Sequence, residues 1–117
     1  IKKLREKFNC ENLRERLKNH HANIDLTFNG WSDIWLDDEF KKWNIISSLQ
    51  RIKVPQLIIQ GNDDEFGTSL QVDAIVCQSR GSVKTCYLDN CGHTPHFDQQ
   101  SKTLKLMTEF VRDLFVI

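Results

Sequence analysis

The sequence has no excess of charge of either sign and no long hydrophobic run. Its 16 lysines and arginines equal its 16 aspartates and glutamates, so it lacks the basic field that attracts nucleic acid. No apolar stretch approaches the roughly 20 residues that a membrane helix requires. We therefore expect neither nucleic acid nor a membrane as a partner. Hydrophobic residues make up 39% and charged residues 27% of the 117 residues, which is typical of a folded domain.

The four cysteines lack the C-x-x-C spacing of common zinc and redox motifs. We expect them to be free thiols in a reducing compartment, and the protein to be cytoplasmic. The acidic residues lack the spacing of a calcium-binding loop, so we expect no metal and no cofactor. The sequence begins at Ile1 and runs directly into a charged, helix-like segment. From this we expect a piece of a longer protein.

Residues 1–53 are predicted to form a helical segment followed by a linker. Apolar residues recur at spacings of four and five, which indicates an amphipathic helix that breaks near residues 9–12; they are Leu4, Phe8, Leu13 and Leu17. A second apolar segment, residues 24–31, is predicted to end as a helix at Gly30. An aromatic cluster and a further short helix before Pro55 follow; the cluster comprises Trp31, Ile34, Trp35, Phe40 and Trp43.

Residues 54–117 have a different, alternating pattern. A short apolar run, residues 56–60, predicts a buried strand that Gly61 ends. A helix over residues 68–78, a strand over 83–88 and a closing amphipathic helix over 101–115 follow. The alternation predicts an α/β fold with two parallel strands and crossover helices. Ligands of such sheets bind beyond the carboxyl ends of the strands, where the loops 61–67 and 89–97 would meet.

These two loops carry the residues best suited to catalysis. Asp64 stands in the first loop and His93 in the second. A carboxylate beside an imidazole holds the ring in one tautomer and stabilises the imidazolium formed during proton transfer. A zinc site made of Cys91, His93 and His96 is a weaker alternative, because the spacing matches no complete four-ligand set.

Two motifs in these loops resemble those of the α/β-hydrolase family. Gly61-Asn62-Asp63-Asp64 is similar to the G-x-x-D that ends a late strand of that fold, and residues 91–96, CGHTPH, resemble its G-H-x-P-H segment. Residues 54–61 resemble the usual lead-in to that strand, and residues 30–44 resemble the end of the cap region in an esterase-like branch. The resemblance covers most of the chain, from about residue 15 onward.

The resemblance implies a C-terminal portion of an α/β-hydrolase. Residues 1–53 would be a helical cap segment and linker, and residues 54–117 the C-terminal part of the core. Asp64 would be the acid and His93 the base of a catalytic triad. His96 would line the pocket or support the structure, and Trp31 and Trp35 would either pack the cap or line the substrate pocket.

The triad nucleophile is missing from the sequence. The family places it on a strand-to-helix elbow, usually G-x-S-x-G, and no such motif occurs in the 117 residues. We therefore expect a Ser or Asp nucleophile upstream of Ile1, no turnover by this chain alone, and hydrolysis of a small ester by the parent protein. The alternative is a noncatalytic interaction domain that retains the fold. Because the strand at 57–59 would lack its neighbour, self-association or pairing with an N-terminal half is also expected.

Overall fold

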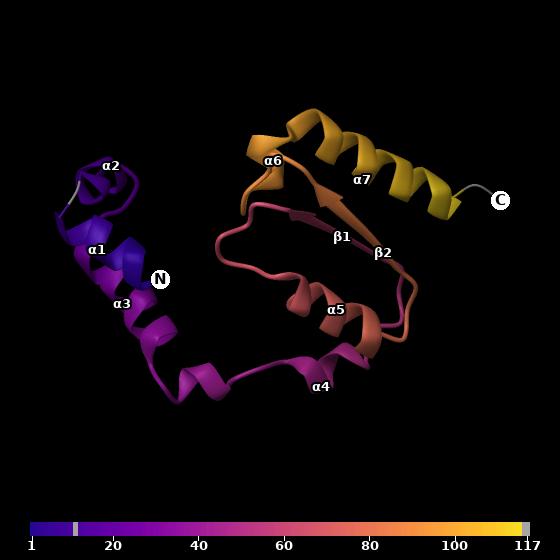
Figure 1. Ribbon diagram of the computed structural model, residues 1–117, viewed down its shortest axis with the longest axis horizontal. Coiled ribbons are helices and arrows are strands. Elements are labelled where there is room, and N and C mark those ends of the chain that lie inside the picture. The colour runs from indigo at the N-terminus through magenta and orange to yellow at the C-terminus, as the bar shows by residue number, and fades with distance from the viewer. Residues whose placement is uncertain (11, 116–117) are drawn as a thin grey trace. The chain divides into compact units, whose positions relative to one another are not determined.

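The computed structural model describes residues 1–10 and 12–115, and the chain forms two compact units (Figure 1). The first comprises Ile1–Asn44 and the second begins at Ile45. The sequence predicted a boundary between residues 53 and 54. The structural units divide earlier, because helix α4 (Ile46–Leu49) packs on helix α5 (Ser69–Gln78) of the second unit.

The first unit is helical, as the apolar spacing predicted. It contains α1 (Lys2–Cys10), α2 (Leu13–Lys18), α3 (Ile24–Leu36) and the 3₁₀ helix η1 (Phe40–Lys42). The interruption between α1 and α2 confirms the predicted break. Phe8 and Phe28 stack with their ring centroids 3.8 Å apart, and Ile24 is buried with them. Leu4, Leu13 and Leu17 pack against this core, so the predicted amphipathic positions are those that hold the unit together.

The prediction that a helix ends at Gly30 was wrong. Helix α3 continues through Gly30 to Leu36, and the backbone of Gly30 does not adopt the positive φ of a glycine cap. The helix starts at Asn23, whose side chain accepts a hydrogen bond from the N–H of Leu26 at 3.0 Å. It stops before Asp37, whose side chain accepts from two N–H groups of the next turn. A polar turn, and not the glycine, ends this helix.

The second unit contains a two-stranded parallel sheet. Strand β1 (Gln56–Gly61) pairs with β2 (Val83–Leu88) in a register that runs from Gln56 opposite Val83 to Gly61 opposite Leu88. In Figure 1 the strands lie between the crossover helix α5 and the closing helix α7 (Gln100–Phe115). These findings confirm the predicted strands, parallel pairing and helices. The short helix α6 (Pro95–Asp98) was not predicted; it lies within the expected loop and begins at a proline.

One face of α7 is left uncovered by the rest of the unit. Its apolar side chains at three- and four-residue spacing are about half exposed, with exposed fractions of 47–56%; they are Leu104, Met107, Val111 and Leu114. Thr103, on the adjoining face, is buried and donates to the carbonyl of Pro95 at 2.9 Å. Within the described residues, no helix has both the length and the apolar character needed to cross a membrane.

Candidate active site

The two loops that follow β1 and β2 are held against each other by backbone contacts. A Cβ atom on Gly61 would lie 2.0 Å from the carbonyl oxygen of Cys91 and 2.3 Å from that of Gly92. Only glycine permits this close approach of one backbone to the other. The N–H of Asp63 then donates to the carbonyl of Cys91 at 2.9 Å. Gly61 therefore fixes how the first loop meets the second.

Asp64 is held by the backbone of its own loop. Its Oδ1 accepts hydrogen bonds from the N–H groups of Phe66 at 2.8 Å and Gly67 at 2.9 Å, the side-chain turn that Asp commonly forms. Gln60 donates more weakly to Oδ2, at 3.4 Å. The side chain of Asp64 is only 9% exposed, so these bonds fix its orientation without competition from bulk water.

His93 faces this carboxylate. Its Nδ1 lies 3.0 Å from Oδ1 and 3.1 Å from Oδ2 of Asp64. Burial by itself would raise the pKa of Asp64, but the hydrogen bonds from Gly67, Phe66 and His93 outweigh burial and hold the pKa below its ordinary value. Asp64 is therefore ionised at neutral pH and can only accept, so Nδ1 of His93 carries the proton. The other ring nitrogen, Nε2, makes no contact with Asp64.

The ring of His93 is accessible on the side away from Asp64. The side chain is 55% exposed, and its only ring contact within the described residues is the edge of Phe66, with centroids 5.0 Å apart. A histidine with one nitrogen on a fixed carboxylate and the other open can take a proton from a nucleophile and return it to a leaving group. The predicted meeting of Asp64 and His93 is thus confirmed as a geometric fact.

Two residues that sequence reasoning did not single out anchor the loop around His93. The carboxylate of Asp98 accepts from the N–H of Gly92 at 2.9 Å. The side-chain amide of Gln99 donates to the carbonyls of Asp89 and Asn90, at 3.2 and 3.0 Å. Both residues follow the proline that starts α6, so Thr94-Pro95 was the available signal for a helical turn that projects side chains back onto the loop.

The predicted pocket residues have local contacts that do not define a pocket. Trp31 packs beside Phe28, and Trp35 packs on the edge of Phe40, both within the first unit. His96 is exposed and contacts the ring of Phe97, with centroids 4.4 Å apart. The role of Trp31, Trp35 and His96 in binding a substrate stays a prediction.

A hollow of about 370 Å³ lies beside the end of β1, and Asp64 forms part of its wall. The remaining wall is mostly polar; it comprises Gln60, Gly61, Asn62, Gly67, Thr68, Ser69 and Tyr87. His93 does not line it. This hollow therefore adjoins Asp64 and not the imidazole.

The zinc alternative has no support in the geometry. Among the described residues, no three His, Cys, Asp or Glu side chains are grouped closely enough to hold a metal ion. Cys91 is buried, and burial together with the nearby carboxylates raises the pKa of its thiol.

Comparisons with known proteins agree with this geometry at the level of fold family. Over 74 residues the chain is 30% identical to "Monoacylglycerol lipase ABHD6" of Mus musculus, covering 63% of this chain and 22% of that protein. Over 82 residues it is 29% identical to "Monoacylglycerol lipase abhd6-B" of Xenopus laevis, covering 68% and 23%. The similarities support an origin in the α/β-hydrolase family. The chain thus spans less than a quarter of each relative. No protein-family model and no solved structure matches it.

Proposed function

We propose that Asp64 and His93 are the acid and the base of a nucleophile–His–Asp triad that hydrolyses an ester. The observation that carries this proposal is the 3.0 Å contact between Nδ1 of His93 and the buried carboxylate of Asp64. His93 would accept the proton of the nucleophile at Nε2 and later donate it to the leaving alcohol. Asp64 would keep the ring oriented and stabilise the imidazolium between these steps.

The nucleophile has to come from outside the 117 residues, because they contain no G-x-S-x-G elbow. The names of the two relatives, both monoacylglycerol lipases, favour a monoacylglycerol as the ester. We further propose that this chain corresponds to the C-terminal portion of such an enzyme, of the esterase-like branch, and that it acts in the cytoplasm.

The test uses a polypeptide that contains this sequence together with an upstream elbow. It should release fatty acid from a monoacylglycerol, and His93→Ala and Asp64→Asn should each reduce kcat by about 10³-fold or more. The matched control is Asp63→Asn, next to the acid, whose side chain makes no hydrogen bond within the described part of the chain; it should retain activity.

The isolated chain provides a second check. It should show no ester hydrolysis above a buffer blank, and any turnover that His93→Ala abolishes would contradict the proposed division of the triad. An inactive longer polypeptide with an intact elbow would favour the noncatalytic interaction domain.

A further inference from the structure

A second feature of the molecule lies at the other end of the two strands. The amino ends of both strands are preceded by basic residues, Lys53 before β1 and Arg80 before β2. A hollow of about 570 Å³ opens here, and five residues form its wall: Ser47, Gln50, Arg51, Lys53 and Arg80. With about 3.3 Å of rise per residue, a six-residue strand separates this hollow from the His93 loop by roughly 20 Å.

Backbone contacts bring these basic residues together. The N–H groups of Arg80 and Gly81 both donate to the carbonyl of Ile52, each at 3.0 Å. A Cβ on Gly81 would lie 2.1 Å from the carbonyl oxygen of Val54, so glycine is required for the two segments to touch. Backbone contacts alone therefore bring Arg51 and Lys53 close to Arg80. The side chains of these three residues take no part in those contacts.

The charges in this hollow are not neutralised by the rest of the unit. No aspartate or glutamate belongs to its wall. The second unit has four cationic side chains without a carboxylate partner among the described residues, and three of them, Arg51, Lys53 and Arg80, line the hollow. The fourth is Lys102 on α7. A chain with no net charge therefore concentrates three positive charges at one place.

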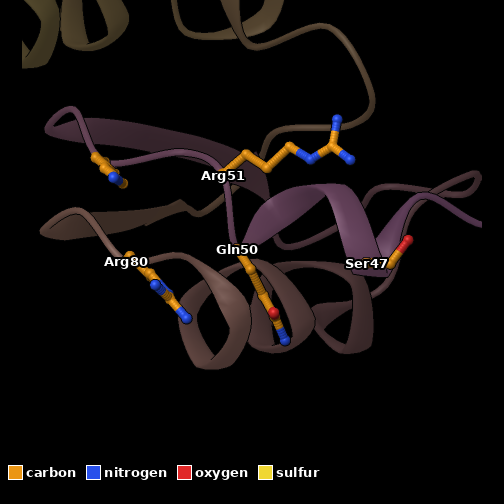
Figure 2. Close-up of a pocket in the computed structure, with 5 residues that line it drawn as sticks. Ser47, Gln50, Arg51 and Arg80 are labelled. Atoms are coloured by element: carbon orange, nitrogen blue, oxygen red, sulfur yellow. The ribbon is translucent and has the colours of Figure 1, made fainter.

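The wall also offers neutral donors. Ser47 contributes a hydroxyl and Gln50 a side-chain amide. The hydrogen bond from this amide to Gln78 is long, at 3.5 Å. In Figure 2 the side chains of Gln50 and Arg80 point to the same side, while that of Arg51, which follows α4, points in another direction. Arg51, Lys53 and Arg80 all belong to the wall of the hollow. A phosphate group fits this arrangement better than a carboxylate, because it carries more charge and more acceptor oxygens for guanidinium and hydroxyl donors.

We propose that this hollow, referred to below as the basic hollow, binds the phosphate group of a phosphorylated small molecule or of a lipid headgroup. The site is independent of Asp64 and His93, which lie at the other end of the strands. Because all three cations are exposed to solvent, binding is weak for a single phosphate and strongly dependent on salt.

The first test is titration of the 117-residue chain with inorganic pyrophosphate. The NMR chemical shifts of the Arg80 and Gly81 amides report binding. Binding should saturate, and raising the salt from about 50 to 200 mM should weaken it severalfold. The double variant Arg51→Gln/Arg80→Gln should weaken binding by about tenfold or more. The matched control, Lys102→Gln/Lys105→Gln on α7, removes the same charge elsewhere and should change the affinity less than about twofold.

The second arm separates the two sources of phosphate. Binding to a lipid headgroup is tested by flotation of the chain with phosphatidylcholine vesicles that contain phosphatidic acid. Vesicles of pure phosphatidylcholine serve as the control. Binding of pyrophosphate alone indicates a soluble ligand, and vesicle binding lost in the double variant indicates a headgroup. If neither probe binds, or if binding is the same in the double variant and the control, the proposal is wrong. Arg51→Lys/Arg80→Lys keeps the charge and should retain most of the binding, and His93→Ala should bind like wild type even if the proposed catalytic role fails.

Discussion

Asp64→Asn is the substitution whose outcome follows most directly from the structure. An asparagine oxygen can still accept from the N–H groups of Phe66 and Gly67, but its amide would point a donor at the proton on Nδ1 of His93. Hydrogen bonds to a charged acceptor contribute about 1.5–3 kcal/mol, and neutral ones about 0.5–1.5 kcal/mol. We expect a net loss of about 2 kcal/mol for this substitution, mostly from the two backbone bonds. The contact with the exposed imidazole contributes less because solvent screens it.

The assay has to report on the second unit alone. All three tryptophans, Trp31, Trp35 and Trp43, belong to the first unit, so their fluorescence does not follow the loss of Asp64. Amide hydrogen exchange of β1 and β2 reports the stability of the second unit directly. A loss of about 2 kcal/mol corresponds to about 30-fold faster exchange through opening of this unit. Asp63→Asn removes the same charge from the neighbouring position and should leave the rates unchanged.

Wild type and Asp64→Asn should also differ in how the stability of the second unit depends on pH. The pKa of Asp64 is lowered in the folded chain from its ordinary value of 3.8. Its contribution to stability is therefore fully present above that value and is lost as the pH falls through the lower folded pKa. The difference in stability between wild type and Asp64→Asn should narrow as the pH falls through the lowered pKa of Asp64. Equal exchange rates in Asp64→Asn and Asp63→Asn at pH 7 would refute the reasoning.

Four further predictions concern two glycines, the loop around His93 and helix α7. Gly61→Ala should destabilise the second unit by about 3 kcal/mol or more, measured by hydrogen exchange. Gly30→Ala should instead stabilise α3 by up to about 1 kcal/mol, because no atom lies within 4 Å of the added Cβ. Tryptophan fluorescence during urea unfolding would measure this second change. Asp98→Ala should cost about 1–2 kcal/mol and broaden the His93 ring signals in NMR. The chain should self-associate in sedimentation experiments, less so with Met107→Lys and Val111→Lys; a dilute wild-type monomer would contradict this.

The strands and the contact between Asp64 and His93 could be predicted because local pattern and topology pointed to the same arrangement. A short apolar run ended by Gly61, and a second strand one helix later, force parallel pairing, and parallel pairing places both following loops at one edge. Asp64 and His93 then had to be near each other. What the sequence could not provide was the means of holding them. The acceptor for the Gly92 N–H is Asp98, a contact across six residues that no periodicity reveals.

The errors have equally specific causes. Gly30 was predicted to end a helix because glycine favours that position, but the cap at Asn23 and the polar turn at Asp37 fix the ends of α3 more strongly. The closing helix was predicted correctly from its apolar spacing, yet Met107 and its neighbours on that stripe are about half exposed. Periodicity shows which face of a helix is apolar, and it does not show whether this chain contains the surface that would cover it.

The two proposed sites share one structural basis, since parallel strands in register have two distinct ends. At the carboxyl end, Gly61 lets two loops touch and places an imidazole on a carboxylate. At the amino end, Gly81 lets two other segments touch and places Arg80 near Arg51. Each glycine permits one backbone contact, and each contact gathers polar side chains that are distant in sequence. Because about six residues of strand separate the contacts, a variant that removes the chemistry of one end should leave the other unchanged, and that independence distinguishes a local site from general loss of the fold.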